Sequence, residues 1–249
     1  MTHPDCSHLC SGNCRRIGCN CLCGEFHDTL SQEELDEIQE DTTSMEEKLG
    51  ALNKLKIILD LCGGTGAWSK PYKDAGYDVR VITMPENDVR TYQLPEEPVY
   101  GILAAPPCTM FSLARTRAIK PRDFNEGMEI VEACLNLIWQ ARKRGKLAFW
   151  ALENPMGYLR QFLGKPPYHF DPWEFGEPWT KGIDLWGYFN FPVKKFTNID
   201  QVMTKEQKAK CLTNSRKLPS ISMLTGSKQQ ARRAQTPAGF ALAFYKANK

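Results

Sequence analysis

Apolar positions between residues 55 and 152 follow two alternating patterns. Short apolar runs predict buried strands at residues 55–61, 77–83, 101–105 and 147–152. Helices are predicted between these strands at residues 68–75 and 125–144. In the longer helix Met128, Val131, Leu135 and Ile138 recur at helical spacing, and Gly145 follows as a stop signal. Strands that alternate with helices predict an α/β fold with a doubly wound, Rossmann-like sheet.

The segment before this core predicts a helical connector over residues 29–54. Two capping-box pairs, Ser31 with Glu34 and Ser44 with Glu47, mark the helix starts. The predicted helices of the connector cover residues 33–39 and 45–52. We expect the connector to join the N-terminal segment to the core.

The segment after the core has a different composition. Prolines and aromatic residues dominate residues 156–195, which predicts a loop-rich insertion with a few short strands. The aromatic side chains can form a small core or line a nucleic-acid groove. At the end of the chain Thr236 as N-cap, Pro237 at the first helical position and Phe240 predict a helix that docks on the core.

Composition and charge narrow the class of protein. A chain of 249 residues with 42% apolar content can close a single core. No apolar run approaches the roughly 18 residues of a membrane span, so we expect no membrane partner and a cytoplasmic location. Residues 205–249 hold ten Lys or Arg against one acid, Glu206. This asymmetry indicates either a polyanionic partner or a solvated basic face.

Six of the ten cysteines lie within residues 1–28. Thiolates spaced this closely can complete a tetrahedral zinc shell in a segment too small for its own core. The spacing fits no two-plus-two zinc finger, so the number of ions stays open, and a reduced cysteine-rich tail is the alternative. The predicted zinc ligands are Cys6, Cys10, Cys14, Cys19, Cys21 and Cys23.

Three predicted strands are each followed by candidate ligand-binding or catalytic residues. The first runs into Gly63–Gly66, where backbone N–H groups can approach a ligand, although such glycines also serve as ordinary turn residues. The third stops at Pro106-Pro107 and presents Cys108 as a candidate nucleophile, although a lone cysteine is more often structural. The fourth ends at Glu153, whose apolar surroundings favour a raised pKa, unless it caps a helix. All three groups are expected at one edge of the sheet.

In this order the motifs resemble those of cytosine-C5 DNA methyltransferases, which are class I S-adenosylmethionine-dependent enzymes. Asp60 to Gly66 is similar to the cofactor loop, Pro106-Pro107-Cys108 with Phe111-Ser112 to the nucleophile loop, and Glu153-Asn154 to the glutamate motif. Residues 185–189 and 233–248 also resemble segments of compact phage-type members. The similarity covers residue 57 to the C-terminus and leaves residues 1–28 unexplained.

The resemblance implies a DNA (cytosine-5-)-methyltransferase acting on double-stranded DNA, in a bacterium or a phage-infected host cell. Cys108 would attack C6 of a flipped cytosine while Glu153 contacts N3. The implied contacts to S-adenosylmethionine are Asp60, Cys62, Gly63, Gly64, Thr65, Gly66 and Trp68. The implied contacts to the nucleic acid are Ser112, Arg115, Arg117, Arg232 and Arg233.

Two departures from the family pattern leave alternatives open. Thr83 stands where an acid that binds the cofactor ribose is expected, so Glu86 or Asp88 would have to substitute. The Gln-x-Arg-x-Arg motif that contacts the flipped base is not recognisable. The same chemistry on RNA or on a free cytosine nucleotide is one alternative, and a catalytically idle nucleic-acid-binding relative is another.

The predicted organisation has five parts. They are a cysteine-rich segment over residues 1–28, a connector over residues 29–54, a catalytic core over residues 55–155, a target-recognition region over residues 156–230 and a docking helix over residues 231–249.

Overall fold

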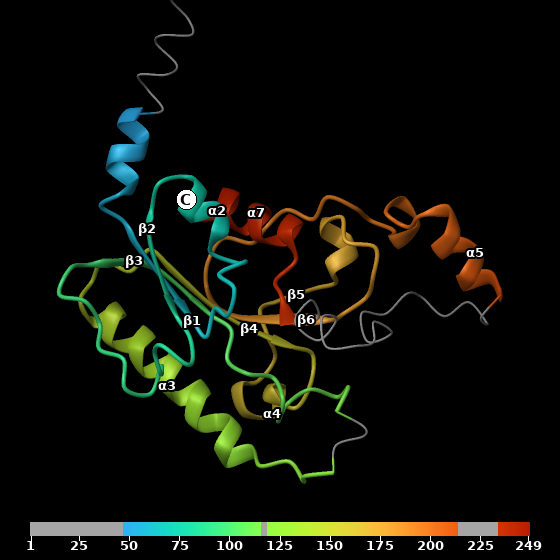
Figure 1. The fold of residues 1–249 in the computed structure, drawn as a ribbon, viewed down its shortest axis with the longest axis horizontal. Coiled ribbons are helices and arrows are strands. Elements are labelled where there is room, and N and C mark those ends of the chain that lie inside the picture. The colour runs from blue at the N-terminus through green and yellow to red at the C-terminus, as the bar shows by residue number, and fades with distance from the viewer. Residues whose placement is uncertain (1–46, 116–118, 214–233) are drawn as a thin grey trace, which may run out of the picture. The chain divides into compact units, whose positions relative to one another are not determined.

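The core of the protein is a six-stranded sheet with the strand order β2-β1-β3-β4-β6-β5 (Figure 1). The computed structural model describes residues 47–115, 119–213 and 234–249. The chain divides into two compact units, residues 1–49 and residues 50–249, and the second unit contains the sheet. The strands are β1 (Ile57–Leu61), β2 (Asp78–Ile82), β3 (Val99–Ala104), β4 (Phe149–Pro155), β5 (Tyr168–Phe170) and β6 (Ile183–Tyr188).

The direction of the strands decides which ends meet. The first four strands run parallel to one another, whereas β6 runs antiparallel to both β4 and β5. The start of β6 therefore lies beside the carboxyl end of β4. This mixed α/β architecture is consistent with the predicted Rossmann-like sheet.

Helices cover both faces of the sheet. α3 (Phe124–Lys143) lies on one face, and α2 (Lys70–Asp74) and α7 (Ala238–Ala247) lie together on the other (Figure 1). Successive residues of β1 point to opposite faces, so that Leu59 joins the core beneath α3 and Ile58 joins the core beneath α7. The shorter elements are α4 (Leu159–Leu163), α5 (Lys205–Thr213) and the 3-10 helices at Pro172–Phe175 and Ile199–Gln201.

The predicted strands and helices of the core are all present, with shifted boundaries. The largest shift concerns β4, which was predicted to end at Leu152 but continues to Pro155. The strand continues because Glu153 and Asn154 pair with the antiparallel β6. The prediction for the last helix was wrong by one residue, because Pro237 has an extended backbone (ψ 131°) and is itself the N-cap.

The region after β4 contributes to the same sheet. As predicted, it is rich in loops and contains two short strands, β5 and β6. Tyr168, Phe170 and Phe175 are buried in the core beneath α7, which agrees with the small-core interpretation of the aromatic residues. Residues 47–53 of the predicted connector are helical, and the predicted zinc ligands lie outside the described residues.

Candidate active site

The glycine turn after β1 has a backbone that most residues adopt only with strain. Gly64 and Gly66 have φ angles of +55° and +69°, and Cys62 has a φ of +57° although it is not glycine. A Cβ at Gly63 would lie 2.4 Å from the carboxyl carbon of Asp60. Glycine at position 63 therefore lets the turn fold directly over the Asp60 side chain.

Asp60 is a fully buried carboxyl group under this turn. The hydroxyl of Ser69 donates to its Oδ2 at 2.6 Å, while Oδ1 has no hydrogen-bond partner among the described residues. Burial raises the pKa of Asp60 to about 6. An unpartnered buried acceptor below a glycine cradle suits a ligand that brings a hydrogen-bond donor, as the amino group of S-adenosylmethionine does.

The loop after β3 holds Cys108 in a fixed, half-buried position. The Cys108 carbonyl accepts hydrogen bonds from the N–H groups of Phe111 at 3.0 Å and Ser112 at 2.8 Å, which closes a tight turn. The Arg122 guanidinium donates to the carbonyls of Met110 at 2.9 Å and Ser112 at 2.8 Å. These bonds order the loop at the backbone, so the thiol needs no side-chain partner to be positioned.

The end of β4 supports this loop through Asn154 and also carries Glu153. The amide of Asn154 donates to the Pro106 carbonyl at 3.0 Å, just before the cysteine. A Cβ at Gly157 would lie 2.3 Å from the Phe111 carbonyl oxygen, so glycine permits close approach of the two chains. Because side chains alternate along a strand, Glu153 points to the face of the sheet opposite to that of Asn154. There it lines a small pocket together with Lys181 and Phe240.

Charges couple Cys108, Glu153 and Lys181. Burial raises the pKa of Cys108, and the Glu153 carboxylate raises it further, while the Lys181 ammonium opposes both effects. Burial likewise raises the pKa of Glu153, and Lys181 opposes that shift. A thiol, a carboxyl group with a raised pKa and a cation therefore act electrostatically on one another.

Lys181 was not predicted from the sequence. It lies two residues before β6, and only the antiparallel pairing of β6 with β4 brings it beside Glu153. The Lys181 N–H donates to the Asp171 carboxylate at 2.8 Å, and the Gly182 carbonyl accepts from the Met156 N–H at 2.8 Å. A lone lysine among prolines and aromatic residues gave no signal that could have identified it.

A second group of charged residues that the sequence did not reveal lies at the same edge. The Asp184 side chain is fully buried and accepts two hydrogen bonds of 2.6 Å from Arg160. Nδ1 of His169 lies 2.7 Å from its Oδ1. Asp184 and His169 share the sheet face opposite to Glu153, and the charge of Asp184 also contributes to the raised pKa of Glu153.

Glu86 and Asp88, the two candidates for the acid that binds the cofactor ribose, differ in exposure. Glu86 is exposed, whereas Asp88 is partly buried and acts electrostatically on Cys62. The Asp88 carboxylate is held by Arg90, whose Nε lies 3.0 Å from both carboxylate oxygens. Asp88 therefore acts on the first residue of the glycine turn. Thr83 is partly buried after the end of β2.

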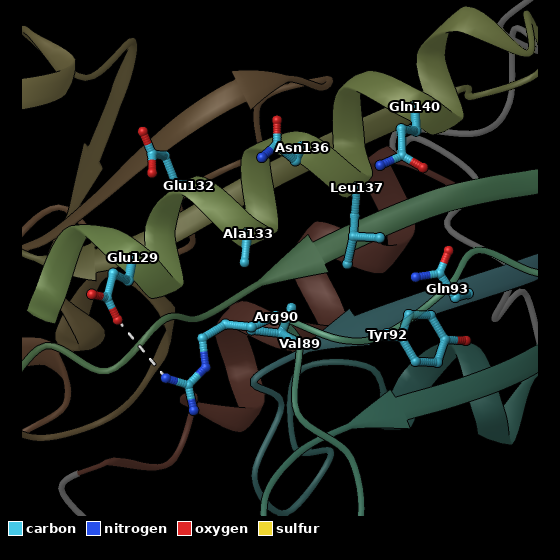
Figure 2. Close-up of a pocket in the computed structure, with 10 residues that line it drawn as sticks. All are labelled: Val89, Arg90, Tyr92, Gln93, Glu129, Glu132, Ala133, Asn136, Leu137 and Gln140. Carbon is cyan, nitrogen blue, oxygen red and sulfur yellow. Dashed lines mark ion pairs between the residues drawn. The ribbon is translucent and has the colours of Figure 1, made fainter.

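Figure 2 shows a separate surface hollow between α3 and the segment that follows β2. Polar groups of Arg90 and Glu129 face each other across it, with Nη1 and Oε2 3.8 Å apart. Neither Cys108 nor Glu153 lines this hollow, so it is distinct from the candidate active site.

The remaining predicted site residues have varied surroundings. Trp68 is only 2% exposed and packs between Phe240 and Phe244 at centroid distances of 5.9 and 5.4 Å. Ser112 is partly buried, and Arg115 donates to the Lys120 carbonyl at 2.7 Å, within its own loop. The predicted nucleic-acid contacts outside the described residues are Arg117, Arg232 and Arg233.

The chain matches no protein-family model and shows no significant match to a curated protein. Within the described residues, no group of His, Cys, Asp and Glu side chains is arranged to hold a metal ion. No helix in the described part of the chain is long and apolar enough to cross a membrane.

Proposed function

We propose that the protein is an S-adenosylmethionine-dependent DNA cytosine-C5 methyltransferase with a methyltransferase-type Rossmann-like core. The observation that carries the proposal is the electrostatic coupling of Cys108, Glu153 and Lys181 at the carboxyl edge of the sheet. The glycine turn with the unpartnered Oδ1 of Asp60 ends a strand at the same edge. Nucleophile, proton donor, cation and cofactor cradle are the groups that this reaction needs.

Each residue has a defined task in the proposed reaction. The Cys108 thiolate adds to C6 of a flipped cytosine, and the electron pair released from the C5–C6 bond makes C5 nucleophilic. Burial raises the pKa of Glu153, which favours donation of a hydrogen bond from its carboxyl group to N3 as negative charge develops on the ring. Lys181 stabilises the thiolate, which burial alone would disfavour.

The cofactor supplies an electrophilic methyl group when it is bound. Asp60, with the backbone of Gly63 to Gly66, would hold it, and Asp88 is the nearer candidate for a contact to its ribose. Once C5 carries the methyl group, a water molecule takes the C5 proton, the electron pair of that C–H bond restores the C5–C6 double bond, and the C6–S bond breaks to release the Cys108 thiolate. The base regains its aromatic ring and the free thiolate is regenerated.

Trapping on DNA that contains 5-fluorocytosine tests the proposal. Fluorine at C5 cannot leave as a proton does, so an active enzyme stays covalently bound to the base. With S-adenosylmethionine and mixed-sequence duplex, we expect wild-type protein to form a complex that survives denaturing electrophoresis. Cys108→Ser should form none because the serine hydroxyl is a far weaker nucleophile, whereas Cys134→Ala, which removes a thiol in α3, should retain the complex.

Circular dichroism of each variant separates loss of chemistry from loss of fold. Absence of any adduct with folded wild-type protein would overturn the enzymatic proposal in favour of an idle nucleic-acid-binding relative. Trapping only on 5-fluorocytosine RNA, or on the free nucleotide, would instead change the substrate. An adduct that persists in Cys108→Ser would remove Cys108 from the nucleophile role.

A further inference from the structure

A row of polar side chains crosses the sheet from the loop that carries Cys108 to the outer strand β5. Asn154, Asp184 and His169 lie directly opposite one another on β4, β6 and β5, so their side chains share one face of the sheet. The Asn154 amide donates to the carbonyl of Pro106, two residues before Cys108. The row therefore connects the surroundings of the proposed nucleophile with the edge strand.

Arg160 on α4 packs onto this row, and α4 lies on the same side of the sheet as α3 (Figure 1). Nε and Nη2 of Arg160 donate to the two carboxylate oxygens of Asp184, each at 2.6 Å, and the Asp184 side chain is fully buried. Nδ1 of His169 lies 2.7 Å from the same carboxylate. A buried acid with three close partners therefore fixes the plane of the Arg160 guanidinium.

The guanidinium of Arg160 keeps hydrogen-bonding capacity toward solvent. Its bonds to Asp184 use Nε and Nη2, and within the described part of the chain no hydrogen bond engages Nη1. The Arg160 side chain is 37% exposed. An arginine that is held in one orientation and presents free N–H groups suits a ligand with paired acceptor oxygens, such as a phosphate.

Arg160 lies beside the proposed site and not at the reacting atoms. It follows Gly157 by three residues, and Gly157 forms a β-bridge with Ser112 of the loop that carries Cys108. Its partner Asp184 is one strand away from β4, and neighbouring strands are about 5 Å apart. This position suits a contact to the backbone of a nucleic acid whose base reaches Cys108.

We propose that Arg160, held by Asp184, binds a backbone phosphate of duplex DNA beside the target base. This inference rests on the proposed function, which supplies the DNA. A flipped nucleotide stays attached to its strand, so a fixed cation next to the site keeps the strand in place while the base occupies the pocket. His169 acts on the contact only through Asp184.

The salt dependence of duplex binding tests the phosphate contact without any activity measurement. Arg160→Gln alone would leave the buried Asp184 carboxylate unpaired, so the comparison is between Asp184→Asn and the double variant Arg160→Gln/Asp184→Asn. Both lack the buried charge, and they differ only at the arginine. Binding of the full chain to mixed-sequence duplex is measured by fluorescence anisotropy between about 50 and 200 mM salt.

Asp184→Asn should keep the salt slope of wild type, because Arg160 retains its charge. The double variant should bind about tenfold more weakly than Asp184→Asn, because it loses a charge-assisted hydrogen bond. Its slope of log K against log salt should be shallower by about 0.9, the contribution of one phosphate contact. The loss should be similar on duplexes of different sequence, because every base pair carries the same phosphates.

Arg80→Gln is the matched control. Arg80 is 33% exposed and is bonded to Asp78 at the start of β2, at the amino end of the parallel strands. Its replacement should leave the salt slope unchanged, and circular dichroism verifies the fold of each variant. Equal slopes for Asp184→Asn and the folded double variant would overturn the proposal. A loss restricted to particular sequences would also overturn it, because it indicates a base contact.

These outcomes are separable from those of the covalent trapping that tests the proposed function. Equal slopes together with a trapped adduct on duplex DNA would overturn the phosphate contact and keep the methyltransferase proposal. The expected Arg160 dependence without any adduct would keep the contact in an idle nucleic-acid-binding relative. Wild-type protein that binds no duplex would overturn this inference, while an adduct with the free nucleotide would still support the chemistry of Cys108.

Discussion

Asp60 is a residue whose burial disfavours the folded state and for which the proposed cofactor site offers a reason. Its carboxyl group is fully buried, its Oδ1 has no hydrogen-bond partner among the described residues, and burial raises its pKa to about 6. A residue chosen for stability at this position would carry no such penalty. The close approach of Gly63 to this carboxyl group indicates that the turn and the acid work together.

The raised pKa of Asp60 predicts a specific pH dependence of stability. The folded protein holds the proton up to about pH 6, whereas the unfolded chain releases it near the ordinary aspartate pKa of 3.8. Between these values the folded state binds more protons, so the free energy of unfolding falls as pH rises, by about 3 kcal/mol in total from this group. Asp60→Asn should remove this part of the slope.

Urea unfolding of wild type and Asp60→Asn at several pH values from 4 to 7 provides the measurement. The control is Asp74→Asn, which removes an exposed carboxyl group from α2 and should leave the slope close to that of wild type. Equal slopes for wild type and Asp60→Asn would contradict the assignment of a raised pKa to Asp60.

At the scale of elements, α7 packs against Trp68, which lies just after the glycine turn. Phe240 stacks on Phe170 with ring centroids 4.1 Å apart, and Phe244 meets Trp68 edge to face. A Cβ at Gly239 would lie 2.0 Å from the Phe175 carbonyl oxygen, so the helix starts in close backbone contact. Trp68 follows the turn by two residues, so packing of α7 stabilises the segment that the cofactor proposal needs.

Removal of the Phe244 ring should destabilise the unit formed by residues 50–249. We expect Phe244→Ala to lower the free energy of unfolding by about 3–5 kcal/mol, because the side chain is fully buried among rings that cannot close the cavity. Leu242→Ala on the same helix is the matched control, and it should cost less than about 1 kcal/mol because its side chain is 46% exposed. Similar losses for both variants in urea unfolding would contradict the docking role of Phe244.

The length and the apolar pattern of each element explain which elements could be predicted from the sequence. Helical spacing identified α3 because twenty residues supply several periods, and apolar runs identified the parallel strands because both faces are covered. The end of β4 was misplaced because Glu153, Asn154 and Pro155 resemble a turn locally. Their pairing with β6, thirty residues later, is a tertiary effect without a local signal.

At the scale of the whole molecule, sheet direction decides which predicted residues meet. The glycine turn, Cys108 and Glu153 could be predicted at one edge because each follows or ends a strand of the parallel sheet. Lys181 and Asp184 could not, because only an antiparallel β6 brings their segment back to that edge. The groups of the proposed reaction could thus be identified from the sequence, whereas the charges beside them follow from long-range topology.

The cysteine-rich segment of the chain predicts zinc binding, a property that the proposed catalytic core does not need. Its six cysteines within residues 1–28 lie outside the described residues, and the described residues contain no metal-binding group. If these thiolates bind zinc, deletion of this segment should also remove the metal. We expect elemental analysis of purified full-length protein to find about one zinc ion or more per chain, because four thiolates complete one tetrahedral shell.

Deletion of residues 1–27 should remove this zinc, and replacement of Cys19, Cys21 and Cys23 by serine should reduce it in the full-length chain. Cys108→Ser is the matched control, since it removes a core thiol and should leave the zinc content unchanged. Zinc-free full-length protein, expressed with added zinc and purified without chelator, would contradict the prediction. Retention of zinc by the deletion variant would place the metal in residues 28–249, where the described residues offer no site.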